Sequence, residues 1–431
     1  MPKLPPAALL PAALLAAAAS APAAAETVVV TADRMIDVLT GRVVERPVVV
    51  ITDGRIASVV GEGTSRPVIP SGARRIDLPG KTILPGLIDM HVHLDSNPRY
   101  GGYTGLQFTD QFWTAQGVGN ARAMVEAGFT TVRNVGSDNY ADVAYKQAID
   151  EGLMQGPRIV PAAHALGATG GHCDQTYLPP SFAARGKAVG DGPQELRNRV
   201  REQRKYGAEV IKVCATGGVF SRNTEPGQQQ LSEEELRAIA DEAHQWGLKT
   251  AAHAHGAAGI KAAIRAGIDT IEHASLIDAE GIKLARARGT WLAMDIYNTE
   301  YTQAEGRKNG VLEDNLRKDR EIAQIQRDGF RAAHRAGAKM VFASDAGVMP
   351  HGDVGRQFRV MVEYGMTPME AIQAATRNAA QALGRERDVG AIATGRFGDI
   401  VAVDGDPIAD IRQLEDVDVV IKGGAIVKSE Q

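Results

Sequence analysis

Cysteine is nearly absent from this 431-residue sequence, which contains only Cys173 and Cys214. A fold held together by several disulfides is therefore excluded, and at most one bridge can form. The sequence also lacks any run of five or more charges of one sign, and its formal net charge is only -4. Without a basic patch, a nucleic-acid partner is not expected. Hydrophobic residues make up 44% of the chain, which is enough to build a substantial globular core.

The first 25 residues carry only one charge, at Lys3, followed by an apolar stretch of alanine, leucine and proline. This stretch is too short to span a bilayer and ends in Ala-x-Ala before Glu26, which is typical of a secretory signal peptide cleaved near Ala25. An unstructured Ala/Pro leader is the alternative. The signal peptide predicts a mature protein that is exported, either periplasmic or secreted. No later run reaches about 18 apolar residues, so no membrane span is expected in the mature chain.

Both ends of the mature chain have the texture of short β-strands. Runs rich in valine and isoleucine, separated by turn residues, predict strands at residues 27–31, 47–51, 55–60, 399–403, 417–421 and 425–428. The middle of the chain has a different pattern. We therefore expect one small noncontiguous β-sandwich domain assembled from residues 26–83 and 390–431.

The middle of the chain, residues 84–389, alternates apolar runs with helical patterns. Eight strands are predicted, at residues 87–94, 130–135, 158–164, 210–215, 249–255, 270–275, 291–297 and 339–345. Helices are expected between them, for example at 193–206, 233–246 and 320–336. Six of the helices end at a glycine just before the next strand: Gly128, Gly207, Gly247, Gly267, Gly289 and Gly337. This order predicts an α/β fold of the (β/α)8 TIM barrel type, with a doubly wound open sheet as the alternative.

Histidines gather where a barrel enzyme carries its chemistry, at the carboxyl ends of the strands. Eight of the ten lie at predicted strand ends or in the loops that follow: His91, His93, His164, His172, His253, His255, His273 and His351. In His91-Val92-His93, residues two apart on a strand point to the same side, so both imidazoles face the barrel interior. Such a pair suits zinc and similar ions. Asp345 closes the eighth strand and completes the set.

Lys212, on the fourth strand, does not fit a cation site as an ammonium, because bound cations would repel it and its burial is costly. Either it lies away from the metals, or it is converted chemically into an anionic ligand. Cys214, two residues further, could bind zinc, but we expect it to pack as a small buried side chain. Cys173 is likewise expected to pack rather than to coordinate.

Six segments carry a resemblance to a known family: PGLIDMHVHLD (85–95), IKVCATGG (211–218), HAHG (253–256), IEHAS (271–275), ASDAG (343–347) and GRFGDIVAVDGDP (395–407). Together they resemble the amidohydrolase superfamily of metal-dependent hydrolases, in that family's order and over nearly the whole mature chain. Within the superfamily the chain is similar to the imidazolonepropionase-related branch. That branch holds Xaa-Pro dipeptidases and bacterial amidohydrolases that hydrolyse ochratoxin A.

The resemblance implies a site for two divalent metal ions, for which zinc is expected and manganese or cobalt stay open. The implied ligands are His91, His93, Lys212, His253, His273 and Asp345. His91 and His93, with Asp345, would hold the more buried ion, and His253 with His273 the second. A carboxylated Lys212 would bridge both, which resolves the problem of its charge. Single-metal deaminases of the superfamily carry a glutamate where this chain has Gly256, which weighs against a deaminase.

These ligands imply hydrolysis by a hydroxide that bridges the metals, with Asp345 moving its proton to the leaving amine. The expected substrate is a small molecule or short peptide with an amide bond next to a C-terminal amino acid, as in a carboxypeptidase or dipeptidase, and N-acyl amino acids such as ochratoxin A are included. Candidate substrate contacts are His164, His172, Arg222 and His255. Arg222 could also be a solvated loop charge, and His255 could instead support a metal ligand.

Two other functions stay open. One is a cyclic amide or lactone hydrolase of the imidazolonepropionase type. The other is a non-catalytic binding protein, although such proteins tend to lose metal ligands and all six positions are filled here. The relatives are frequently multimeric, so a homo-oligomer is expected.

Overall fold

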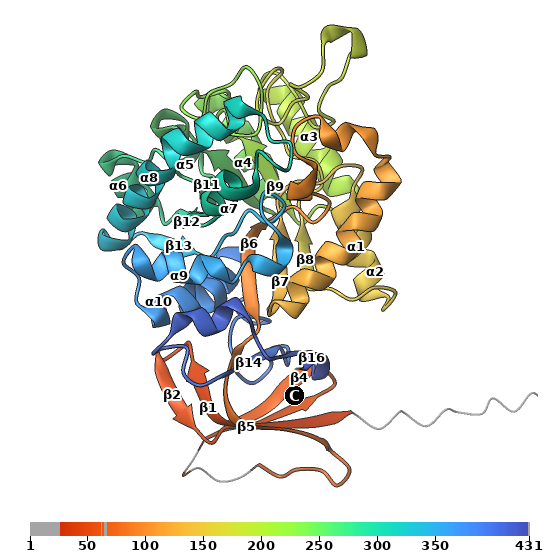
Figure 1. The fold of residues 1–431 in the computed structure, drawn as a ribbon, viewed down its shortest axis with the longest axis vertical. Helices are drawn as coiled ribbons and strands as arrows, with labels where there is room; N and C mark the ends of the chain where they lie inside the picture. The colour runs from red at the N-terminus through yellow and green to blue at the C-terminus, as the bar shows by residue number, and fades with distance from the viewer. Residues whose placement is uncertain (1–25, 62, 64–66, 430–431) are drawn as a thin grey trace, which may run out of the picture.

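A β-sheet built from both ends of the chain lies below a larger α/β unit in this computed structural model (Figure 1). The structure describes residues 26–61, 63 and 67–429, and the predicted signal peptide, residues 1–25, lies outside them. The strands of the sheet are β1 (Thr27–Asp37), β2 (Arg42–Glu45), β3 (Val48–Thr52), β4 (Arg55–Val60), β5 (Arg74–Pro85), β14 (Ile400–Asp404), β15 (Val419–Lys422) and β16 (Ala425–Ser429).

The order of strands in this sheet is β16-β15-β14-β5-β1-β3-β4, with β2 paired to β1. β5 joins the two ends of the chain, because it pairs parallel to β1 and antiparallel to β14. Its buried side chains share one apolar core with strands from both ends; Ile51, Ile83 and Ile400 are among its members. Six strands lie where the sequence predicts them, whereas β2 and β5 are additional.

The α/β unit contains eight parallel strands in two sheets. β6 (Leu87–Val92), β7 (Phe129–Asn134) and β8 (Arg158–Pro161) form one sheet. β9 (Val210–Cys214), β10 (Lys249–Ala254), β11 (Thr270–His273), β12 (Trp291–Ala293) and β13 (Lys339–Val341) form the other. All eight overlap the predicted strands.

Backbone hydrogen bonds connect the two sheets at both seams. At one seam Met90 N donates to Phe342 O (3.1 Å) and Asp345 N donates to His91 O (2.9 Å). At the other, Glu209 N donates to Pro161 O and Leu166 N donates to Lys212 O, both at 2.8 Å. The strands therefore follow one another around a TIM barrel, as the sequence predicts.

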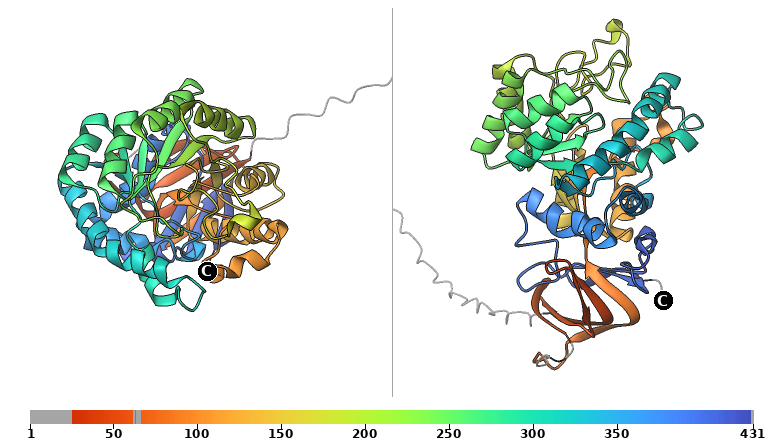
Figure 2. Two further views of the ribbon diagram at one scale, coloured as in Figure 1. Left: turned by 90° about the horizontal axis from the view of Figure 1, so that it is seen from above. Right: turned by 90° about the vertical axis from the view of Figure 1, so that its left-hand side faces the viewer.

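The helices surround the strands, as the view from above shows (Figure 2). They are α1 (Asp110–Glu126), α2 (Ala141–Asp150), α3 (Pro193–Lys205), α4 (Glu233–Gln245), α5 (Ala257–Ala266), α6 (Ala279–Arg288), α7 (Asn298–Glu305), α8 (Glu313–Arg335), α9 (Arg356–Glu363), α10 (Pro368–Gln373) and α11 (Ala379–Leu383). α5 and α6 end at Gly267 and Gly289, whose φ angles of 97° and 72° are left-handed, as expected of helix-ending glycines.

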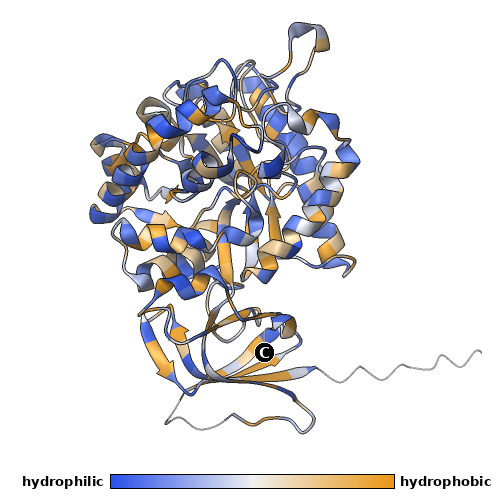
Figure 3. Ribbon diagram, viewed as in Figure 1, coloured by the Kyte–Doolittle hydropathy of each residue, from blue (hydrophilic) through white to orange (hydrophobic). Residues whose placement is uncertain are grey.

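Apolar residues concentrate on the strands, while the outer helix faces are largely hydrophilic (Figure 3). The helices therefore pack their apolar faces against the sheets and expose their hydrophilic faces. In the described part of the chain, no helix combines the length and apolar character that crossing a membrane requires.

One ion pair ties the base of the barrel to the terminal sheet. Arg158, the first residue of β8, donates from Nη1 to Asp399 Oδ2 at 2.6 Å, and Asp399 Oδ1 accepts from Gly423 N at 2.8 Å. The Asp399 side chain is only 7% exposed. The carboxylate therefore bonds both parts of the fold at once.

We expect Asp399→Asn to lower the free energy of unfolding by about 1–3 kcal/mol, because the partly buried Arg158 guanidinium loses its charged partner. Urea-induced unfolding measures this loss. Asp388→Asn is the control, because it neutralises a half-exposed partner of Arg55 and should cost at most about 1 kcal/mol. Equal unfolding midpoints for the two variants would contradict the expectation.

Candidate metal centre

A cavity of about 310 Å³ opens at the carboxyl ends of the barrel strands, where loops rather than further strands surround the side chains. All six predicted ligands line it, together with two of the four predicted substrate contacts: His91, His93, Lys212, His253, His273, Asp345, His172 and His255. Residues up to 254 positions apart in the chain thus meet at one place because parallel barrel strands all end on the same side.

These side chains lie close enough together for several of them to bind one metal ion. Asp345 Oδ1 lies 3.4 Å from His91 Nε2 and 3.6 Å from His93 Nε2. Two groups have potential ligand atoms that all lie within 4.8 Å of one another, His91–His273–Asp345 and His253–His255–His273. Clustered imidazole and carboxylate donors suit zinc and related divalent cations. His255 therefore lies among the potential metal ligands, whereas the sequence indicates only a substrate contact or support for a ligand.

Burial keeps most of these imidazoles neutral, which is the form that binds metals. It lowers the pKa of His93 to about 3, with the Lys212 ammonium adding to the effect, and holds the pKa of His91 and of His253 well below the usual range. His273 differs. Burial lowers its pKa, but the Asp295 carboxylate outweighs this, so that the net shift of the His273 pKa is upward.

Burial also shifts the pKa values of the two other predicted ligands, Asp345 and Lys212. It raises the pKa of Asp345 to about 6 and lowers the pKa of Lys212 to about 8, because each charged form is poorly solvated there. Within the described residues Lys212 makes no ion pair, although its side chain lies in the cavity wall. A lysine of this kind is readily deprotonated and can act as a nucleophile.

The backbone around the site is strained at functional positions. Asp345, His273 and Ala274 have φ angles of 57°, 65° and 48°, a region that residues other than glycine rarely adopt. Asp89 stabilises this arrangement next to Asp345: Ser344 donates to its carboxylate from Oγ (2.5 Å) and N (3.2 Å). Such strain persists only where surrounding contacts enforce it, and it is common at functional sites.

The loop after β8 covers the cavity and is fixed by a disulfide. Cys173 is bonded to Cys214, with their Cα atoms 5.8 Å apart. The expectation that each cysteine only packs is wrong, because the loop folds back over the end of β9 and brings Cys173 onto Cys214. Next to the bridge, the His172 ring stacks on His253 at a centroid distance of 4.1 Å.

The remaining two predicted contacts lie elsewhere. His164 lines a neighbouring cavity of about 410 Å³, which shares His93 and Cys173 with the first cavity. Arg222 is exposed, donates from Nη1 to Tyr103 Oη at 2.5 Å and lines neither cavity. The structure therefore brings His164 near the metal centre but not Arg222.

Four buried polar residues beside the ligands escape sequence analysis: Asp89, Arg133, Glu272 and Asp295. They lie inside predicted strands and match no spacing rule. The one available signal is a charged residue within a strand that is otherwise apolar, as in Ile271-Glu272-His273.

A parallel barrel with a cluster of imidazoles and a carboxylate at its carboxyl end is the arrangement found in many metal-dependent hydrolases. Residues 82–427 match the model described as "Amidohydrolase family". The chain belongs to this family, and the resemblance found in its motifs is confirmed.

Its relatives include an ochratoxinase and proteins described as an Xaa-Pro dipeptidase and a prolidase. The chain is 33% identical to ochratoxinase of Aspergillus niger over 371 residues, which cover 80% of this chain and 75% of the relative. It is also similar to a solved Xaa-Pro dipeptidase with bound methionine (34% identity, TM-score 0.85, 93% of this chain and 99% of the other). A prolidase complexed with N-methylphosphonate-L-proline is comparable (33%, TM-score 0.86, 94% and 100%). The protein is accordingly a hydrolase of amide bonds.

We expect loss of the Cys173–Cys214 bridge to loosen the loop after β8. The double variant Cys173→Ser/Cys214→Ser should lower the free energy of unfolding by about 2–4 kcal/mol, because the unfolded chain regains freedom. Denaturant titration of both proteins measures the difference. Alkylation of the unfolded wild-type protein is the control and should detect no free thiol. An unchanged unfolding midpoint would contradict a stabilising bridge.

Proposed function

We propose that the protein is an exported, binuclear metal-dependent amidohydrolase that cleaves the amide bond next to a C-terminal amino acid. The observation that carries the proposal is the gathering of six potential ligands around one cavity. Likeness to an Xaa-Pro dipeptidase, a prolidase and ochratoxinase supports carboxypeptidase or dipeptidase activity, including action on N-acyl amino acids such as ochratoxin A. Export rests on the signal pattern of residues 1–25.

The donor set fits two divalent cations, for which we propose zinc. His91, His93 and Asp345 would hold one cation, and His253 with His273 would hold the other. The neutral imidazoles and the short distances between their nitrogens support this assignment. Zinc suits imidazole and carboxylate ligands, although manganese and cobalt do as well.

Lys212 would join the two halves as a carbamate. Its pKa of about 8 leaves part of the side chain as a free amine near neutral pH. The amine nitrogen can attack carbon dioxide, form an N–C bond and lose a proton, which converts a cation into an anion with two oxygen donors. This conversion removes the repulsion that an ammonium would exert on bound cations.

Two cations bound here would supply Lewis-acid polarisation of the amide carbonyl and a lowered pKa of bound water. Asp345 would take up a proton at its carboxylate and pass it to the leaving amine nitrogen. Asn298 contacts the second oxygen of this carboxylate, because its Nδ2 donates to Asp345 Oδ2 at 3.5 Å. No serine or cysteine nucleophile is required.

The two adjoining cavities offer room for the two halves of an amide substrate. They meet at His93 and Cys173, next to the metal centre. We propose that His172 and His164 contact the free carboxylate of the C-terminal amino acid and that His255 contributes to the metal side of the cavity. The Cys173–Cys214 bridge would keep His172 in place against His253.

The test is release of free amino acid by the mature, zinc-loaded protein from Xaa-Pro and basic dipeptides, from N-acyl-phenylalanines and from ochratoxin A. We expect turnover of linear amides, loss of activity after chelation and recovery on adding zinc. A cyclic lactam and a lactone serve as controls. Cleavage of the cyclic compounds alone would overturn the linear-amide proposal, as would activity that survives complete metal removal.

Asp345→Asn should reduce kcat by about 10²- to 10⁴-fold, because the amide can neither accept nor deliver the proton. The wild-type enzyme should lose activity as the pH falls. Burial raises the pKa of Asp345 to about 6 without metal, and bound cations favour its anion, so the acid limb of kcat/KM should lie below pH 6. Steady-state kinetics between pH 4 and 8 measure this limb. Full activity of the variant, or a flat profile, would contradict the role of Asp345.

A further inference from the structure

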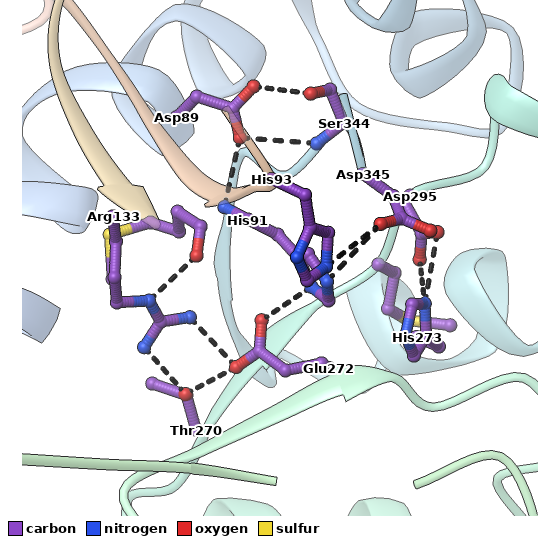
Figure 4. A network of polar contacts seen from close by, with 12 residues as sticks. Asp89, His91, His93, Arg133, Thr270, Glu272, His273, Asp295, Ser344 and Asp345 are labelled. Carbon is purple, nitrogen blue, oxygen red and sulfur yellow. Dashed lines mark hydrogen bonds and ion pairs between the residues drawn. The ribbon is translucent and has the colours of Figure 1, made fainter. Parts of the chain in front are cut away.

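Two buried carboxylates, those of Glu272 and Asp295, lie against two of the histidines, His91 and His273 (Figure 4). Glu272 Oε2 lies 3.0 Å from His91 Nδ1. Both oxygens of Asp295 lie within reach of His273 Nδ1, at 2.9 and 3.0 Å. Glu272 is fully buried and Asp295 is 1% exposed. Each carboxylate thus contacts the Nδ1 nitrogen of its histidine, and at His91 the other ring nitrogen, Nε2, lies 3.4 Å from Asp345 Oδ1.

The Glu272 carboxylate is held by a buried cation. Arg133 Nη2 donates to Glu272 Oε1 at 2.8 Å, and Thr270 Oγ1 donates to the same oxygen at 2.5 Å. Arg133 is itself fixed, because Nε donates to Met90 O at 2.7 Å and Nη1 donates to Thr270 Oγ1 at 2.8 Å. These contacts occupy Oε1 and leave Oε2 to accept a hydrogen bond from His91.

This geometry determines which nitrogen of His91 is free. If Nδ1 carries the proton and donates to Glu272, Nε2 keeps its lone pair. Nε2 is the atom that lies 3.4 Å from Asp345 Oδ1, on the side of the proposed cation. The carboxylate therefore fixes both the tautomer and the orientation of the ring for metal binding.

The Asp295 carboxylate is held differently. Gln326 Nε2 donates to Oδ1 at 3.2 Å and Asn298 Nδ2 donates to Oδ2 at 2.5 Å, so two neutral amides replace the arginine. Asp295 also lines the cavity that contains the ligands. His273 Nδ1 lies against both oxygens, which leaves its Nε2 for a cation.

We propose that Glu272 and Asp295 are positioning residues, one for each half of the metal centre: Glu272 orients His91, and Asp295 orients His273. The inference rests on the proposed binuclear site. It goes further by naming the buried groups that set the affinity for each cation. Arg133 acts through Glu272, whose charge it balances. Carboxylates that orient a metal-bound histidine in this way commonly change metal affinity by about 10- to 100-fold.

Replacement by an amide tests the proposal without changing side-chain volume. In Glu272→Gln the amide oxygen still accepts from Arg133, so the NH₂ group faces His91 Nδ1. His91 must then accept at Nδ1 and carry its proton on Nε2, which no longer binds a cation. In Asp295→Asn the new NH₂ group likewise opposes either a neighbouring amide donor or the His273 Nδ1 proton.

Zinc titration of the metal-free proteins is the measurement, with a competing chromophoric chelator and metal analysis of the products. We expect wild-type protein to bind two cations and each variant to bind one of them about 10- to 100-fold more weakly. Asp399→Asn is the matched control, because it also converts a buried, arginine-paired carboxylate to an amide but lies at the base of the barrel. It should retain both affinities despite its lower stability.

The outcomes separate the two proposals. Wild-type protein that binds fewer than two cations would contradict the binuclear centre itself. Two cations bound equally well by wild type, Glu272→Gln and Asp295→Asn would overturn only the positioning roles.

A measurement on the unaltered protein covers the case in which a variant does not fold. Histidine-selective ¹⁵N labelling of the metal-free wild type reports the tautomer of each ring by NMR. At a pH high enough to keep both rings neutral, we expect protonated Nδ1 and unprotonated Nε2 for His91 and for His273, whose pKa Asp295 raises, with signals assigned through single His→Asn variants. The opposite tautomer at either ring would overturn its assigned carboxylate.

Discussion

The contact between β6 and the segment that follows β13 is the one on which the candidate metal centre depends. These two parts of the barrel are about 250 residues apart in the chain, and Asp89 fixes them together. Its carboxylate accepts from His91 N on one side and from Ser344 N and Oγ on the other. Because His91 and Asp345 follow directly from these anchored positions, closing the barrel and assembling the ligands are one event. A shift of β6 by one residue at this seam would turn His91 away from the cavity.

The charge balance of the site follows from this assembly. Burial disfavours positive charge on His91, His93 and His253 and negative charge on Asp345, whereas the Asp295 carboxylate raises the pKa of His273. The buried polar network beneath the cavity reverses this tendency locally, since Arg133 and Glu272 pair as opposite charges. The site therefore combines neutral donors that face a ligand with a charged network that faces the protein. Such a network costs desolvation energy and is commonly retained for the geometry it enforces.

Sequence patterns predicted most of the barrel and the candidate ligands, but few of the contacts that hold them in place. All eight barrel strands and the helix-ending glycines carry local signals, and the ligands could be found because they end those strands. β5 was missed since Pro79-Gly80 interrupts its pattern, and its strand character depends on pairing with β1 and β14. The disulfide and the surface position of Arg222 depend on the paths of long loops, which no local pattern encodes. Glu272 and Arg133 stand out in the sequence only as charges within apolar strands, and their partners become visible only in the tertiary structure.

The terminal sheet has a consequence for how the polypeptide is made. β5 lies between β1, synthesised before it, and β14, synthesised more than 300 residues later. Until the ribosome has released the last strands, the edge of β5 that will receive β14 has unpaired amides and carbonyls. An open edge of this kind can recruit strands from other nascent chains. Productive folding thus favours a chain that is kept apart from its neighbours, by chaperones or by low local concentration, until translation is complete.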